Sequence, residues 1–220
     1  MICSLCSFPD TTLFYRWIER GHDYLLCPNC GYIFLSPVHH LDPLAEKKVY
    51  DFHENDPSDL AYINFLNQLV IPLKKYIHSR GEFSKGLDFG CGPGPTLHLL
   101  LEEEGLKMDI YDPLYYPNEE LLLKSYDVVT CSEVFEHFKD PMGDFTKLYN
   151  ALRPGGILGV MTEFFHEGRD FPNWHYIKYH THVGFFSTNT LSWLARRFNM
   201  EVDFIGDRVA IFKKSEPFSL

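Results

Sequence analysis

The turn at residues 87–94 reads Leu-Asp-Phe-Gly-Cys-Gly-Pro-Gly. It follows a short apolar run typical of a strand, and the residues after it are typical of the start of a helix. Gly90, Gly92 and Gly94 let the backbone turn sharply and approach a ligand closely. The pattern predicts a loop that binds a nucleoside, with a purely structural glycine-rich turn as the alternative.

Acidic residues accompany this turn on both sides. Asp88 lies directly before the glycines, and Asp112 closes the next predicted strand, where a carboxylate can accept hydrogen bonds from both hydroxyls of a ribose. A dinucleotide-binding loop would carry a further glycine at position 95, which is Pro95 in this chain. The residues therefore favour a nucleoside ligand other than a dinucleotide.

Two Cys-x-x-Cys pairs lie near the N-terminus, Cys3 with Cys6 and Cys27 with Cys30. Each pair can direct two thiolates at one metal ion, and two pairs complete a tetrahedral zinc site with no open position. A segment of this length cannot bury enough surface to fold alone, so a metal would supply the missing stability. We predict structural zinc; free thiols or a redox pair are the alternatives.

Aromatic residues and histidines are concentrated at residues 171–186. The rings could cover a planar or apolar molecule, and His180 or His182 could take a proton near neutral pH. His137, next to Glu136, is expected to face the same cleft. The alternative is that these histidines only satisfy carbonyl groups in the core. As metal ligands, His180 and His182 have no carboxylate at a suitable sequence spacing.

The rest of the chain must position these groups. From Lys85 onward predicted strands and helices alternate, which indicates a parallel sheet covered on both faces. Strands are expected at residues 86–89, 107–111, 126–131, 157–162, 201–205 and 208–213, and helices near 95–104, 140–151 and 188–198. Gly206-Asp207 predicts a tight antiparallel hairpin between the last two strands. Before the sheet, an apolar helical pattern follows Asp59, and Pro72 is expected to bend or divide that helix.

Three sections follow from this pattern: a zinc-ribbon-like module at 1–40, a helical linker at 41–82 and the main domain at 83–220. Tyr50, His53 and Asn55 in the linker are candidates for a lid over the ligand, since entry must be gated.

Composition limits the partners. The 220 residues carry a formal net charge of −10 and no basic run longer than two residues, which disfavours nucleic acid. The N-terminus lacks the pattern of a signal peptide, and no apolar run reaches membrane-spanning length. We therefore expect a cytoplasmic protein, in which cysteines stay reduced.

Four segments, LDFGCGPG, IYDP, YDVVTCSEVFEHFKDP and LRPGGILGVMT, are similar in order and spacing to the motifs of class I S-adenosylmethionine-dependent methyltransferases. The resemblance covers residues 85–213. It implies an α/β, Rossmann-like sheet with strand order 3-2-1-4-5-7-6 and the cofactor across the carboxyl ends of the first strands. The cysteine-rich prefix resembles the zinc ribbon of some bacterial small-molecule methyltransferases.

The resemblance also implies roles for individual residues. Residues 90–94, called the glycine loop below, include Cys91 and would pass under the methionine part of S-adenosylmethionine. Asp88 would support the loop and the cofactor's amino group. Asp112, followed by Pro113, would hold the ribose. The far side, near the methyl group, would be lined by Cys131, Ser132 and Glu133. Neither Cys91 nor Cys131 is expected to bind metal.

The chain departs from the family between Asp112 and Asp127. The segment is too short for the usual third strand and its adenine-contacting acidic residue, so this strand is expected to be short or missing. Adenine recognition would then rely on backbone amides or stacking.

These features predict S-adenosylmethionine-dependent methyl transfer to a small-molecule acceptor. Methylation of a protein or RNA, with the ribbon as a docking module, is one alternative, and a non-catalytic cofactor-binding scaffold is another. An NAD-dependent oxidoreductase is disfavoured by Pro95 and the terminal hairpin.

Overall fold

The computed structural model describes residues 1–52, 55–80 and 84–216. Its larger part is a six-stranded sheet in the order β5-β4-β6-β7-β10-β9. The strands are β4 (Lys85–Phe89), β5 (Lys107–Tyr111), β6 (Tyr126–Ser132), β7 (Leu152–Met161), β9 (Met200–Ile205) and β10 (Val209–Lys214). The first four are parallel, whereas β10 is antiparallel to both β7 and β9. The predicted α/β fold with a terminal hairpin is confirmed.

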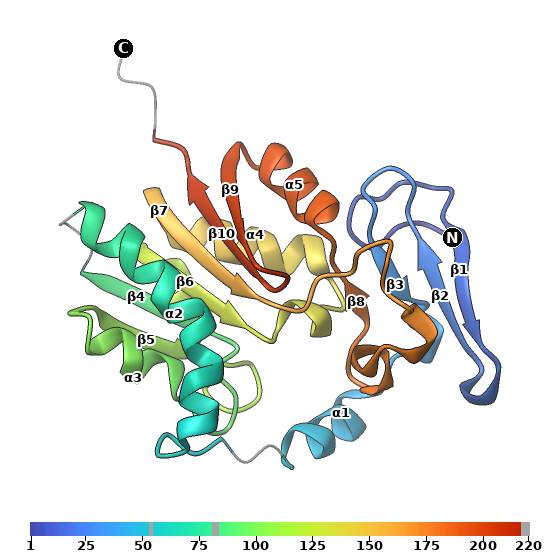
Figure 1. Ribbon diagram of the computed structural model, residues 1–220, viewed down its shortest axis with the longest axis horizontal. Helices are drawn as coiled ribbons and strands as arrows, with labels where there is room; N and C mark the ends of the chain where they lie inside the picture. Colours follow the sequence, from blue (N-terminus) through green and yellow to red (C-terminus); the bar gives the residue numbers. More distant parts are fainter. Residues whose placement is uncertain (53–54, 81–83, 217–220) are drawn as a thin grey trace.

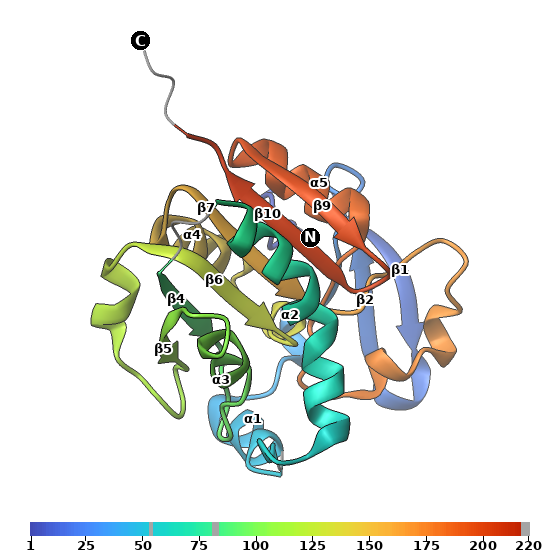
Figure 2. The same ribbon diagram turned by 60° about the vertical axis from the view of Figure 1, so that its left-hand side comes forward.

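Helices cover both faces of this sheet (Figures 1 and 2). One face is covered by α2 (Leu60–Arg80) and α3 (Leu97–Glu102), and the other by α4 (Pro141–Ala151) and α5 (Thr188–Arg197). Successive residues of the central strands point to opposite faces. Val128 therefore packs in the core under α2, and Val129 packs in the core under α4. This double burial explains the nearly continuous apolar runs of β6 and β7.

The strand that the resemblance placed third is absent from the described residues. Between β5 and β6 the chain forms only an isolated bridge from Asp112 to Tyr116 and the 3-10 helix η3 (Glu119–Leu123). The sheet therefore ends at β5. The physical reason is length, because the short connection has to cross the edge of the sheet and return to the start of β6.

Most predicted elements shift by only one residue, whereas two elements differ more and the helix that contains Pro72 is not divided. Strand β7 starts at Leu152, not at residue 157, because Leu152 already pairs with Tyr126 before a register shift. Helix α3 is shorter than the predicted 95–104. Pro72 does not divide α2, which runs continuously from Leu60 to Arg80. Proline has no N–H, so the helix lacks one main-chain hydrogen bond at Pro72. The buried side chains of Leu69, Val70 and Leu73 pack in the core and stabilise the helix there.

The N-terminal module is a small antiparallel sheet formed by β1 (Thr12–Trp17), β2 (His22–Leu26) and β3 (Ile33–Leu35). A fourth strand, β8 (Gly184–Phe185), joins it from the distant segment that follows β7. The 3-10 helices η1 (Ile18–Arg20) and η2 (Pro37–His39) lie after β1 and β3. Helix α1 (Pro43–Tyr50) then leads from the module toward α2 (Figure 1).

In the described part of the chain, no helix combines the length and the apolar character needed to cross a membrane.

Candidate active site

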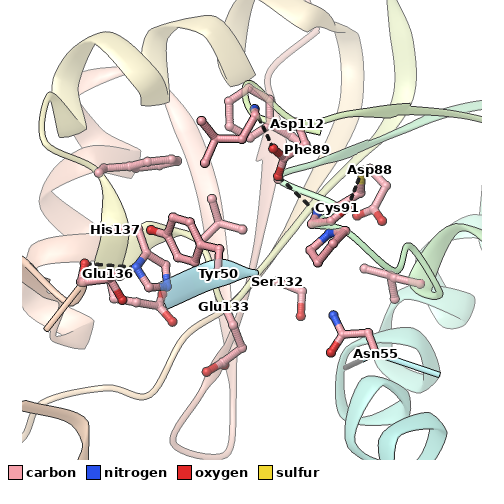
Figure 3. Close-up of a pocket in the computed structure, with 18 of the residues that line it drawn as sticks. Tyr50, Asn55, Asp88, Phe89, Cys91, Asp112, Ser132, Glu133, Glu136 and His137 are labelled. Atoms are coloured by element: carbon pink, nitrogen blue, oxygen red, sulfur yellow. Dashed lines mark hydrogen bonds between the residues drawn. The ribbon is translucent and has the colours of Figure 1, made fainter. Parts of the chain in front are cut away.

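A cavity of about 710 Å³ opens beside the carboxyl ends of β4, β5 and β6. The glycine loop and Asp112 line one part of it, and the histidines and tyrosines of the segment after β7 line another. In Figure 3, Ser132 and Glu133 lie between Glu136 and His137 on one side and Asp88 and Cys91 on the other. Parallel strands expose their carboxyl ends at one edge of a sheet, which is where ligands bind in open α/β folds.

The glycine loop is held in a conformation that requires glycine at its first position. Gly90 has φ +77°, and a Cβ there would meet the side chain of Val134 at 2.5 Å. The Gly90 amide donates to the carbonyl of Tyr111 at 2.7 Å, which ties the loop to the end of β5. At Gly94 a Cβ would overlap the backbone of Asn55, so the linker lies directly against the loop.

Asp112 ties the glycine loop to the loop that follows β5. Its Oδ2 accepts a hydrogen bond from the Gly92 amide at 3.1 Å, and its Oδ1 accepts from the amides of Leu114 and Tyr115 at 2.8 and 3.1 Å. The carboxylate is buried but lines the cavity. Each carboxylate oxygen can accept more than one hydrogen bond, so Oδ2 keeps capacity for a ligand hydroxyl.

Asp88 lies deeper, at the end of β4. Its side chain is buried and its Oδ1 accepts a hydrogen bond from the Thr130 hydroxyl at 2.8 Å. Burial raises the pKa of Asp88 to about 7, against the lowering effect of the Thr130 hydrogen bond. This carboxyl group can therefore change charge near neutral pH.

Glu133 carries two signs of a functional position. Its backbone is left-handed, with φ +53°, which is strained for a residue other than glycine. Its Oε1 is buried with no hydrogen-bond partner among the described residues. Desolvation, with the nearby negative charge of Glu136 as the next cause, raises the pKa of Glu133 to about 9. A buried carboxyl group with an unpartnered oxygen in a cavity is suited to a ligand that supplies a donor or a positive charge.

Behind Glu133 lies a fully buried network. The hydroxyl of Tyr176 donates to Glu136 Oε1 at 2.5 Å, and the Thr162 hydroxyl donates to Glu136 Oε2 at 2.9 Å. Tyr176 also lies 3.4 Å from Glu133 Oε2. These contacts join the end of β6, the end of β7 and the following segment into one wall of the cavity.

His137 and His182 form an adjoining wall. Their rings are 4.8 Å apart at 80°, and Tyr50 packs edge-on against His137. His137 Nδ1 is 3.0 Å from the carbonyl oxygen of Thr181, and both imidazoles line the cavity. His180 is exposed and does not belong to the cavity lining.

The carboxylate of Glu136, which directly precedes His137 in the sequence, joins both histidines. Glu136, His137 and His182 each present a ligand atom within 4.8 Å of the others. The sequence separates Glu136 from His182 by several elements, so only the fold brings them together.

Glu163 organises the rest of the segment after β7. Its carboxylate accepts hydrogen bonds from Arg169 Nη1 at 2.5 Å and from the indole nitrogen of Trp174 at 2.9 Å. On its other oxygen, Arg208 approaches to 3.5 Å from the β9–β10 hairpin. This buried carboxylate thus holds the aromatic segment and the hairpin around one centre.

The four N-terminal cysteines fit a zinc ion. Their Sγ atoms all lie within 4.8 Å of one another, with Cys3 to Cys30 at 3.8 Å and Cys6 to Cys27 at 3.5 Å. A tetrahedral Zn–S bond length of about 2.3 Å requires neighbouring sulfurs about 3.8 Å apart. Four thiols at this spacing provide the donor set of a closed, structural site.

Most of the residues predicted to bind the cofactor line the cavity: Asp88, Gly90, Cys91, Gly92, Asp112, Pro113, Ser132 and Glu133. Two others do not. Cys131 is fully buried in the core, because β6 alternates its faces, and Gly94 is covered by Asn55. Of the lid candidates, Tyr50 and Asn55 line the cavity, whereas His53 lies outside the described residues.

Sequence reasoning missed Glu163, Arg208, Tyr62 and Phe65, which also line the cavity. Glu163 directly follows the strand predicted at residues 157–162, and an acidic residue at that place was the available signal. Tyr62 and Phe65 are partly buried positions of α2, and nothing in a helical pattern distinguishes them from ordinary packing residues.

Residues 61–203 match a protein family described as a methyltransferase domain. The ubiquinone biosynthesis O-methyltransferase of Pseudomonas putida (strain GB-1) is 31% identical over 152 residues, 68% of this chain and 59% of that protein. The enzyme of the same name from Vibrio atlanticus (strain LGP32) is 36% identical over 82 residues, 37% of this chain and 35% of that protein. The chain thus matches less than two thirds of the length of these relatives.

Solved structures show the same fold at low sequence identity. An O-methyltransferase family protein from Burkholderia thailandensis superposes with a TM-score of 0.54 at 13% identity, over 80% of this chain and 60% of that one. Human N-acetylserotonin methyltransferase, solved in complex with S-adenosylmethionine, superposes with a TM-score of 0.55 at 13% identity, over 77% of this chain and 56% of that one.

Proposed function

This chain belongs to the methyltransferase domain family, and we propose that it transfers a methyl group from S-adenosylmethionine to a small molecule. The observation that carries the proposal is one continuous cavity. It begins at the glycine loop and Asp112 and ends at His137 and His182. One end of it suits a nucleoside, and the other end has groups that can handle a proton.

At the cofactor end, the residues present fit S-adenosylmethionine. Asp112 has capacity to hold the ribose hydroxyls, and ionised Asp88 would favour the cofactor's ammonium group. The loop around Gly92 would lie along the methionine part. When bound, the cofactor supplies an electrophilic methyl group, and the chain contributes alignment and exclusion of water.

At the acceptor end, His137 and His182 are the candidates to take a proton from the acceptor. The hydrogen bond from His137 to the Thr181 carbonyl fixes the orientation of one ring. His180 is not included, because it lies outside the cavity lining. Tyr176 and Glu136 shape the floor of this part of the cavity.

The linker would act as a lid over both ligands. Lys139 Nζ binds Glu46 Oε2 on α1 at 2.6 Å, and the Tyr115 hydroxyl donates to Asp51 at 2.7 Å. These two contacts fasten the linker to the loop after η4 (Phe135–His137) and to the loop after β5, while Asn55 lies against the glycine loop. Deleting residues 45–56 should weaken cofactor binding, and unchanged affinity would disprove the lid.

Small molecules are the favoured acceptors for two reasons. The relatives named above are enzymes of ubiquinone biosynthesis, and the net charge of −10 disfavours RNA. A zinc ion at the four cysteines would complete the N-terminal module.

The direct test is product formation. Purified protein and S-adenosylmethionine would be incubated with panels of phenols, carboxylic acids and amines, and with protein and RNA fractions, while S-adenosylhomocysteine is quantified. Turnover that depends on a small acceptor supports the proposal. Turnover only with protein or RNA supports the docking alternative, and cofactor binding without turnover on any panel supports a scaffold.

A further inference from the structure

The N-terminal module contains the four cysteines and is called the cysteine module below. Its strand β3 lies between two hydrophobic cores. Tyr32, just before it, and Phe34 face the methyltransferase domain, where Tyr32 packs against Phe186 with ring centroids 4.9 Å apart. Ile33 and Leu35 point the other way, into a second core. All four side chains are at most 2% exposed. The module therefore has no separate core of its own on either side of β3.

That second core is shared between the module and the segment after β7. Tyr24 of the module packs against Phe171 and Phe185 with centroids 5.3 and 5.7 Å apart. Trp174 and Tyr176 complete the cluster and stack on each other at 4.9 Å. Tyr176 is the residue whose hydroxyl binds Glu136 in the cavity wall. The same ring thus belongs both to the shared core and to the active site.

Main-chain hydrogen bonds continue this connection to the histidines. The Leu35 amide donates to the Val183 carbonyl at 2.8 Å, and the Val183 amide donates to the Glu136 carbonyl at 2.7 Å. Val183 follows His182 directly, and Glu136 precedes His137. Val183 is therefore hydrogen-bonded both to the cysteine module and to the loop that carries His137. Figure 1 shows β8 lying beside β3 at this junction.

The turn formed by Cys27 and Cys30 leads directly into β3. Cys30 is separated from the strand by only Gly31 and Tyr32. The amide of Cys27 donates to the Tyr32 carbonyl at 2.9 Å, and the Gly31 amide donates to the Cys27 carbonyl at 2.9 Å. A metal that joins Cys27 and Cys30 to Cys3 and Cys6 would fix the turn that begins β3.

We propose that the four-cysteine module is a positioning element of the acceptor site, which holds Tyr176 and His182 against Glu136 and His137. It is not a detachable module, because β3 is buried on both faces and is paired with β8 of the methyltransferase domain as well as with β2. The residues that bind the cofactor lie on other elements, so losing the module should affect the acceptor end of the cavity selectively. The term acceptor rests on the proposed function, whereas the structural coupling does not.

Hydrogen exchange measured by mass spectrometry tests the coupling without any acceptor. The Cys30→Ser variant of the 220-residue chain would be compared with the unaltered chain in peptides from residues 176–186 and from β6. We expect exchange at 176–186 to rise at least about tenfold, with β6 unchanged and the calorimetric affinity for S-adenosylmethionine within about threefold. Unchanged exchange at 176–186, with metal lost, overturns the proposal.

A second pair of variants separates coupling from general unfolding. A Cβ at Gly184 would overlap the hydroxyl of Tyr32, so Gly184→Ala should push β8 away from β3 while leaving all four cysteines intact. Adding Tyr32→Phe removes that hydroxyl and should restore part of the exchange protection at 176–186. Arg16→Ala, which breaks an exposed pair with Asp23 elsewhere in the module, is the control and should change nothing there.

The outcomes can be told apart. If Cys30→Ser unfolds the whole chain, the Gly184→Ala pair decides, and normal protection at 176–186 in that variant overturns the proposal. If the unaltered protein fails to bind S-adenosylmethionine, the proposed function fails, but the exchange result still decides whether the module positions this segment.

Discussion

His137 Nδ1 donates a hydrogen bond to the main-chain carbonyl of Thr181, 3.0 Å away, and so joins the loop after β6 to the segment after β7. A carbonyl only accepts hydrogen bonds, so this contact assigns the ring proton to Nδ1 and leaves Nε2 of the neutral imidazole as the acceptor. A ring fixed in this tautomer beside His182 is arranged to receive a proton.

The first prediction concerns that ring. His137→Gln should leave the affinity for S-adenosylmethionine within about threefold but lower methyl transfer by about 10²–10⁴-fold, the usual contribution of general base catalysis. His180→Gln is the matched control, because His180 is exposed and outside the cavity lining. Equal loss of activity in both variants would contradict a role for His137 in proton transfer.

A second prediction follows from Asp88. Its pKa is raised to about 7, so below neutral pH the carboxyl must lose a proton before it can favour a bound ammonium group. Affinity for S-adenosylmethionine should therefore increase with pH up to about 7, by nearly tenfold per pH unit at the acidic end, and then level off. Calorimetry across this range should give a flat profile for Asp88→Asn. A flat profile in the unaltered protein would rule out this role.

A third prediction concerns stability and Glu133. Burial raises its pKa from 4.5 to about 9, so between these values the folded chain holds a proton that the unfolded chain releases. The contribution of Glu133 to the free energy of unfolding therefore falls as pH rises through that range, and it levels off above it. Glu133→Gln does not titrate, so its advantage in Tm should grow from acidic pH up to about pH 9.

The control for this measurement is Glu120→Gln, because Glu120 is exposed on η3. It should show a constant difference in Tm from the unaltered protein. A Tm advantage of Glu133→Gln that does not change with pH would show that the Glu133 carboxyl is not buried in this way.

The fourth prediction is one zinc ion per chain, measured by elemental analysis of purified protein. Cys6→Ser should lose the metal and lower Tm, because a four-thiolate site contributes its binding energy to folding. Cys91→Ser should keep the metal, since Cys91 lies in the glycine loop, away from the cluster. Equal zinc content in both variants would place the metal elsewhere.

Local patterns in the sequence predicted the glycine loop and the terminal hairpin well. The glycine loop, Asp112 and the terminal hairpin are each specified by neighbouring residues, and the structure forms the loop and the hairpin at those positions. The missing third strand could also be expected, because the length of the connection before Asp127 limits what it can form.

The acceptor end was less predictable, because it depends on pairing between distant segments. Strand β8 has only two residues and is a strand only because β3 pairs with it. The meeting of Glu136 with His182 likewise depends on the fold, as does the gathering of Arg169 and Arg208 around Glu163. No periodicity or local spacing encodes such contacts.

The central claim is that this cavity binds S-adenosylmethionine through the glycine loop and Asp112, and calorimetric titration tests it most directly. The 220-residue chain should bind S-adenosylmethionine and not NAD, and Asp112→Asn should weaken binding by about 1–3 kcal/mol, while the exposed control Glu120→Gln should not. Binding of NAD without binding of S-adenosylmethionine, or an Asp112 variant that binds normally, would contradict the account.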